Sequence, residues 1–201
     1  MKSYGRSAAV VLLGVSLIIG FLLCEAAARL ILNPADYLSP TMMRDEILGH
    51  AIKPNTAGFD EWGFRNVRVP VTVDIVALGD SHTYGNTATM DDAWPSVLAR
   101  KTGREVYNLG LGGYGPNQYY HLLMNKGLKL RPKLVICGLY MGDDFENAFS
   151  ITHGFDYWSF LRKDRWQPVN PDNWEPGPPV RGADLRNWFS RHSMLYRMVV
   201  H

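Results

Sequence analysis

Cysteine is scarce in this chain, and neither sign of charge is in excess. The two cysteines among 201 residues are Cys24 and Cys137, and Cys24 lies in an apolar run, so no disulfide between them is expected. The formal net charge is +2, and charged residues make up 20% of the chain. This balance argues against a nucleic-acid partner and against disorder, and it is typical of one globular domain with an appendage.

The sequence also lacks a group of histidine, cysteine or carboxylate residues at the spacing of metal ligands. Asp143, Asp144 and Glu146 come nearest to such a group, but solvation of a loop accounts for acidic residues there. We therefore predict no metal and no cofactor.

Charge is absent from residues 7–24, SAAVVLLGVSLIIGFLLC. As a helix rising roughly 1.5 Å per residue, this run reaches about 27 Å, which nearly spans the apolar core of a bilayer. Lys2 and Arg6 precede it, so the positive-inside tendency places the N-terminus in the cytoplasm and the bulk of the chain in the periplasm or outside the cell. We interpret residues 1–32 as a retained single-pass membrane anchor, with a cleaved signal peptide as the alternative.

Residues 33–70 contain four prolines and scattered glycine and asparagine, which is typical of a connector with little regular structure. Beyond it, strand-like and helix-like patterns alternate. The strand-like segments are VDIVALG (73–79), EVYNLG (105–110) and PKLVICGLY (132–140), and the helix-like ones are DDAWPSVLARKTG (91–103) and PNQYYHLLMNKGLKL (116–130). This alternation predicts an α/β fold over residues 71–201, a three-layer α/β/α doubly wound parallel sheet.

The C-terminal part is less regular. Residues 164–182 hold five prolines and two tryptophans, Trp166 and Trp174, and we interpret this segment as a packed insertion or lid, with a sugar-binding site as the alternative. Residues 183–201 place apolar side chains on one side of a helix, which predicts an amphipathic helix.

Each predicted strand ends in a polar, glycine-rich segment. Because the carboxyl ends of parallel strands meet at one edge of a sheet, these segments are expected to share a crevice. Ser81 follows the first strand, and a serine hydroxyl becomes a nucleophile where a base takes its proton and donors hold the oxyanion. On the tripeptide Gly-Asp-Ser alone, a helix cap explains these residues equally well. The three segments are GDSHTYG (79–85), GLGGYGPNQ (110–118) and MGDDFEN (141–147).

Three blocks, LGDSHTYG (78–85), NLGLGGYGPNQ (108–118) and GDDFENA (142–148), together resemble the SGNH (GDSL-type) hydrolase superfamily in order and spacing. The resemblance implies that Ser81 is the nucleophile. It also implies an oxyanion hole made by the amides of Ser81 and Gly113 with a side chain of the third block. Asp80, Asn108 and Asn147 are the supporting residues. The anchor and the connector motifs DEILGHAIKPN (45–55) and WGFRN (62–66) look like the membrane-attached branch of this superfamily.

The third block departs from the family, because Asp143 stands where the family has an asparagine. An ionised carboxylate only accepts hydrogen bonds, and its charge opposes an oxyanion. Three interpretations stay open: Asp143 is protonated through burial, Asn147 replaces it as the donor, or the hole has two donors. Capping of the loop by Asp143 and Asp144 is the structural alternative.

The family's Asp-x-x-His block, which supplies the general base, is absent. We interpret His82, beside Ser81, as a pocket or surface residue, because neighbouring side chains at a tight turn point apart. His153 is a candidate for lining the crevice, and His50 is assigned to the connector without a role. The chain also lacks the strands that precede this block in the family, so we interpret it as an N-terminal portion of a longer protein with weak or no activity of its own.

The resemblance implies a membrane-anchored serine hydrolase of acyl esters, in particular acetyl esters of cell-surface carbohydrate. An O-acetyltransferase of exported polysaccharide is the first alternative, because transfer and hydrolysis share these residues. A non-catalytic carbohydrate-binding or scaffold protein on the same fold is the second.

Overall fold

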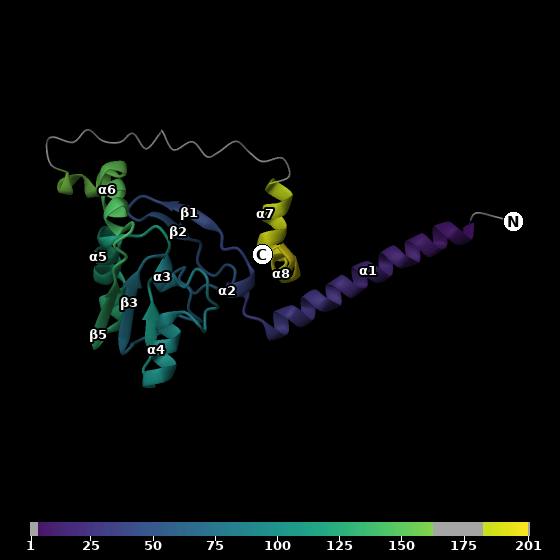
Figure 1. Cartoon of the computed structure of the whole chain (residues 1–201), viewed down its shortest axis with the longest axis horizontal. Coiled ribbons are helices and arrows are strands. Elements are labelled where there is room, and N and C mark those ends of the chain that lie inside the picture. The colour runs from purple at the N-terminus through teal and green to yellow at the C-terminus, as the bar shows by residue number, and fades with distance from the viewer. Residues whose placement is uncertain (1–3, 163–182, 201) are drawn as a thin grey trace. The chain divides into compact units, whose positions relative to one another are not determined.

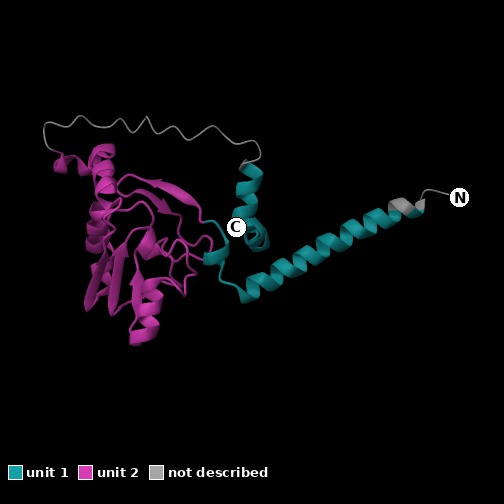
Figure 2. Ribbon diagram, in the orientation of Figure 1, with its two compact units in different colours: residues 1–39, 182–201 teal, residues 40–181 magenta. Residues whose placement is uncertain are grey.

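The computed structural model describes residues 4–162 and 183–200 (Figure 1). The chain divides into two compact units, which are residues 1–39 with 182–201 and residues 40–181 (Figure 2). The second unit is mixed α/β and contains a small parallel sheet, whereas the first contains a long apolar helix.

The sheet of the second unit has three parallel strands in the order β4-β3-β5. The strands are β3 (Ile75–Gly79), β4 (Val106–Asn108) and β5 (Leu134–Gly138). Ile75 aligns with Val106 on one side and with Leu134 on the other. Every residue of β3 is buried, as the apolar run predicts for the central strand of a parallel sheet. The predicted parallel sheet is confirmed for these three strands.

The outer strand β5 is more exposed than its apolar sequence predicts. Leu134 is 46% exposed and Leu139, just beyond the strand, is 59% exposed. Among the residues that the structure describes, β5 pairs only with β3, so its other edge is open. The apolar run therefore predicted the strand correctly, whereas the burial of the strand depends on neighbours that the run does not specify.

Helices follow the strands where the apolar periodicity predicts them. The helix expected at 91–103 ends at Gly103, whose φ of 66° is a left-handed C-cap. The helix expected at 116–130 ends at Asn125 and continues as a 3₁₀ turn over Gly127–Leu130. The helices of this unit are α3 (Ser81–Tyr84), α4 (Trp94–Thr102), α5 (Pro116–Asn125) and α6 (Asp144–Gly154), and a second 3₁₀ turn covers Asp156–Leu161 (Figure 1).

The expected connector contains a β-hairpin that its composition concealed. β1 (Met42–Asp45) and β2 (Gly49–Ile52) pair antiparallel. Asp45 Oδ1 accepts hydrogen bonds from the amides of Ile47 and Leu48, at 2.9 and 2.8 Å, and this closes the turn. The prolines of this region lie outside the two strands, so they do not interrupt the pairing.

The first unit is built around α1 (Tyr4–Ile31), together with α2 (Pro34–Tyr37), α7 (Ala183–His192) and α8 (Met194–Val200). Over Ala8–Ile31, α1 is long and apolar enough to cross a membrane, and an anchor and a signal sequence both meet this description. The single C-terminal helix expected at 183–201 breaks at Ser193, whose Oγ accepts from the amide of Tyr196 at 3.1 Å and so caps a new helix. Trp166 and Trp174 lie outside the described residues.

Candidate active site

Ser81 is the first residue of the short helix that follows the buried central strand. Asp80 caps this helix, because its Oδ1 accepts from the amide of His82 at 2.9 Å. A side chain at Gly79 would run into the Thr83 hydroxyl, so the turn from strand to helix needs glycine. Within residues 4–162 and 183–200, the hydroxyl of Ser81 takes part in no hydrogen bond, and the residue is partly exposed. The Asp80 cap and Ser81, the candidate nucleophile, therefore lie in one turn.

The glycine-rich segment after β4 packs directly against this turn. Asn108 is buried; its Nδ2 donates to Thr83 O and its Oδ1 accepts from the amide of Gly110, both at 2.8 Å. A Cβ added to Gly110 would lie 2.6 Å from the Tyr84 amide nitrogen, and one added to Gly112 would lie 3.5 Å from Ser81 Cβ. No side chain of this segment thus separates Ser81 from the backbone of Gly112.

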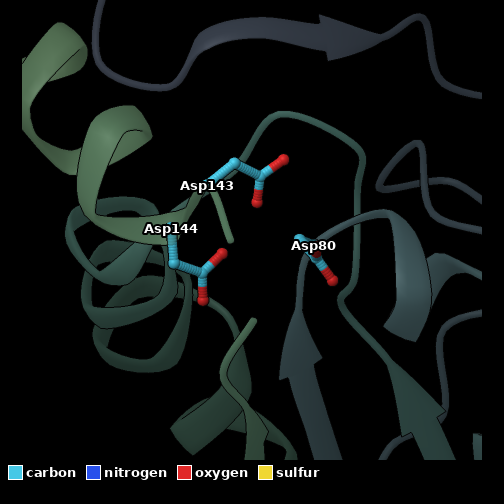
Figure 3. Close-up of side chains that lie close together, drawn as sticks. All are labelled: Asp80, Asp143 and Asp144. Atoms are coloured by element: carbon cyan, nitrogen blue, oxygen red, sulfur yellow. The ribbon is translucent and has the colours of Figure 1, made fainter. Parts of the chain in front are cut away.

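Three carboxylates from two of the loops lie close together, and one of them, Asp80, directly precedes Ser81 in the sequence. Oxygen atoms of Asp80, Asp143 and Asp144 lie within 4.8 Å of one another. Figure 3 shows the carboxyl groups of Asp143 and Asp144 directed toward the side where Asp80 lies. The first and third strand-end loops therefore approach each other at these side chains. Like charges at this separation repel, so each carboxylate needs a donor, a proton or a cation to be stable.

Hydrogen bonds account for two of these three carboxylates. Asp144 is buried, and it accepts from the Tyr119 hydroxyl at 2.8 Å and from the Tyr140 amide at 2.9 Å. Burial raises the pKa of Asp144, and the neighbouring Asp80 and Asp143 carboxylates add to this effect. Asp143 differs, because its buried Oδ1 has no hydrogen-bond partner within the described ranges. Of the three, Asp143 is therefore the one with a buried oxygen that no donor among the described residues reaches.

His82 is the partner of Asp80. Its Nδ1 lies 3.0 Å from Asp80 Oδ2, while its side chain is 64% exposed. The ring also lies against Tyr140, with 4.4 Å between the ring centroids. The hydrogen bond to Asp80 is the main cause that raises the pKa of His82, with the charge of that carboxylate as a second cause. His82 is thus placed at the rim of the site.

The hydrogen-bonded pair of His82 and Asp80 is expected to contribute to the free energy of unfolding at low pH and to lose this contribution as the pH rises. A histidine whose pKa is raised by folding stabilises the protein fully below its unfolded value of about 6.5 and loses that contribution as the pH passes its folded pKa. We expect NMR titration of the His82 ring to give a pKa above the ordinary value. Asp80→Asn keeps the acceptor for the His82 amide and removes the charge, so it should return the pKa toward normal. A wild-type His82 that titrates at or below the ordinary value would contradict this assignment.

Residues 60–66 of the connector form hydrogen bonds with the backbone that follows the serine helix and with the backbone of β4. The sequence did not reveal this role. Arg65 is buried and donates to Gly85 O at 2.7 Å and to Ala88 O at 3.0 Å, behind the serine turn. Asn66 pairs with the backbone of Asn108, accepting from its amide and donating to its carbonyl, both at 2.9 Å. The motif WGFRN was the only signal, and its length was too short to indicate which backbone groups it binds.

Asp60 organises this connector segment. It is 3% exposed, and it accepts from the amide of Phe64 at 2.9 Å, from Asn66 Nδ2 at 3.0 Å and from the Tyr107 hydroxyl at 2.6 Å. Burial and the Asp60 charge raise the pKa of Tyr107, so its hydroxyl remains a donor. The connector segment is therefore tied to β4 through a buried carboxylate.

Two other candidates, Asn147 and His153, form hydrogen bonds with groups other than Ser81. Asn147, a suggested oxyanion donor, directs its Nδ2 to Tyr114 O at 3.4 Å. His153 is buried, stacks on Phe149 and forms a hydrogen bond through Nδ1 with Phe149 O at 2.9 Å. Both side chains thus engage groups other than Ser81.

The chain was compared with known proteins at three levels. Neither the protein-family models, nor the curated proteins, nor the solved structures gave a match.

Proposed function

We propose that the chain carries the nucleophile and part of the oxyanion hole of a serine ester hydrolase of the SGNH (GDSL-type) superfamily. One observation carries this proposal: Ser81 begins a helix after the buried central strand, and a Cβ on Gly112 would lie only 3.5 Å from Ser81 Cβ. Backbone amides of glycines this close to a serine can donate to a developing oxyanion. The sheet would then be part of a three-layer, doubly wound α/β fold.

In the proposed reaction, Ser81 Oγ attacks the carbonyl carbon of an acyl ester, and its proton passes to a general base. The amides of Ser81 and Gly113 hold the oxyanion, and when the tetrahedral intermediate collapses the leaving oxygen takes the proton from the base and departs as the alcohol. Water then releases the acyl group from Ser81. The Asp-x-x-His block that supplies the base in this superfamily is absent from these 201 residues, so the chain alone is expected to react slowly.

The substrate and the location follow from the same assignment. With α1 as a membrane anchor, the unit of residues 40–181 would face the periplasm or the exterior, where acetylated carbohydrate is a substrate. A sugar hydroxyl in place of water would make the protein an O-acetyltransferase. The acidic cluster favours a further alternative, a non-catalytic binding protein, because a charged Asp143 opposes an oxyanion.

A fluorophosphonate probe tests the proposal on the full chain in detergent. We expect the probe to attach to Ser81, to be lost completely in Ser81→Ala and to be unaffected in Ser150→Ala, which changes an exposed serine of α6. Mass spectrometry of the labelled peptide identifies the site. If the wild-type chain takes no label under conditions that label a related esterase, the catalytic assignment fails and the binding alternative gains support.

A further inference from the structure

His50, in the second strand of the connector hairpin (β2), lies against the glycine segment beside Ser81. Its Nε2 is 2.8 Å from Gly112 O, although the two residues are 62 positions apart in the sequence. The ring packs on Tyr114, with 5.1 Å between the centroids, and the Tyr114 hydroxyl donates to His50 O at 2.8 Å. Tyr114 is fully buried, so the histidine is held through both its ring and its backbone.

The Gly112 carbonyl decides which ring nitrogen of His50 carries a proton. A carbonyl oxygen only accepts, so Nε2 must carry the proton that it donates to Gly112 O. The neutral Nε2–H tautomer and the imidazolium both meet this requirement. The contact is therefore a hydrogen bond from the side chain of β2 to the backbone of the glycine segment.

Holding Gly112 O also sets the direction of the Gly113 amide. The carbonyl of Gly112 and the N–H of Gly113 belong to one planar peptide, which is trans, so they point in opposite directions. A peptide between two glycines rotates easily, because neither residue has a Cβ to restrict it. Without His50, this peptide could turn and present a carbonyl oxygen where the Gly113 N–H is needed.

The lack of a side chain at Gly113 leaves room for the His50 ring. Its φ is +78°, and an added Cβ would lie 3.2 Å from His50 Cε1. A side chain there would be strained and would push the ring away from Gly112 O. The close approach of the His50 ring to Gly112 O thus requires the positive φ of Gly113 and the absence of a side chain at that residue.

We propose that His50 is a positioning residue: its hydrogen bond to Gly112 O locks the Gly112–Gly113 peptide so that the Gly113 amide faces the oxyanion formed at Ser81. The inference rests on the proposed hydrolase function and deepens it. It assigns a role in the site to the hairpin of residues 42–52, which lies far from the serine in the sequence.

Two substitutions separate the hydrogen bond from packing. His50→Phe keeps an aromatic ring against Tyr114 and removes the donor, whereas His50→Gln keeps an N–H donor at a similar reach. Loss of one oxyanion donor slows catalysis by about 100-fold or more, and a peptide that is misoriented part of the time should cost about tenfold. We expect His50→Phe to lower the rate constant for fluorophosphonate labelling by at least about tenfold, and His50→Gln to stay within about threefold of wild type.

A second measurement needs no reaction. In the full chain labelled with ¹⁵N-glycine, the Gly113 amide resonance reports the orientation and exchange of its peptide. We expect it to shift or broaden in His50→Phe and to be restored in His50→Gln. A Gly113 resonance and a labelling rate that are both unchanged in His50→Phe would overturn the proposal.

The two readouts also distinguish this proposal from the proposed function. If the wild-type chain takes no label, the hydrolase assignment fails, and the Gly113 resonance alone decides whether His50 locks the peptide. An unchanged resonance in His50→Phe then refutes the lock, and a resonance that changes and is rescued in His50→Gln supports it. Should His50→Phe not fold, His50→Asn takes its place, because its shorter amide does not reach Gly112 O.

Discussion

Replacing Asp143 with asparagine is expected to raise the rate at which Ser81 reacts with a fluorophosphonate by about 100- to 1,000-fold. The carboxylate at this position only accepts hydrogen bonds, and its buried Oδ1 has no partner among the described residues. An amide of the same shape donates instead, and a single oxyanion donor contributes about 3 to 4 kcal/mol to transition-state stabilisation. The substitution also removes one charge from a cluster whose oxygens lie within 4.8 Å of one another. The measurement is the second-order rate constant for labelling of the full chain.

Asp144→Asn is the matched control for Asp143→Asn. It removes the same charge from the same cluster, but its carboxylate already accepts from Tyr119 and Tyr140, so no new donor reaches Ser81. We expect no acceleration from this control. Equal acceleration in both variants would assign the effect to charge instead of to a donor, and no acceleration in Asp143→Asn would remove position 143 from the oxyanion hole.

Replacing Asp60 with alanine is expected to lower the free energy of unfolding by about 3 to 5 kcal/mol, because each buried donor left without an acceptor costs about 1 to 3 kcal/mol. Asp60 accepts from the Phe64 amide, from Asn66 Nδ2 and from the Tyr107 hydroxyl. The Tyr107 side chain is only 2% exposed, so water does not readily replace the lost acceptor. Urea denaturation followed by circular dichroism measures the change.

Two further variants serve as controls for Asp60→Ala. Asp60→Asn keeps the shape and one acceptor oxygen, so we expect an intermediate loss of stability. Asp91→Ala changes an exposed aspartate and should leave the free energy of unfolding within about 0.5 kcal/mol of wild type. If Asp60→Ala unfolds at the urea concentration of the wild type, the buried carboxylate does not hold the connector segment to β4.

The sequence was sufficient where structure is local. The apolar run ending at Gly79 predicted the buried central strand, because a strand covered on both faces needs apolar residues at successive positions. The uncharged N-terminal run predicted the long helix α1, because length and composition alone set that property. Glycine at position 103 marked the end of α4, since a left-handed C-cap favours that residue.

Contacts between distant segments were not predictable in the same way. The open edge of β5 was missed, because its apolar residues do not reveal whether another strand lies beside them. Arg65 and Asp60 resembled loop residues, since nothing near them in the sequence shows that they bind backbone and a tyrosine of other elements. His50 was assigned no role for the same reason.

By itself, the sequence determined the alternation of strands and helices, the apolar N-terminal helix and the position of Ser81 at the end of the central strand. These features arise from periodicity, capping and turn residues, which act over a few positions. Only the tertiary structure decided that Asp80, Asp143 and Asp144 approach within 4.8 Å and that His50 binds Gly112 O from 62 positions away. Such contacts depend on how the hairpin and the loops pack, and packing is set by the whole unit of residues 40–181.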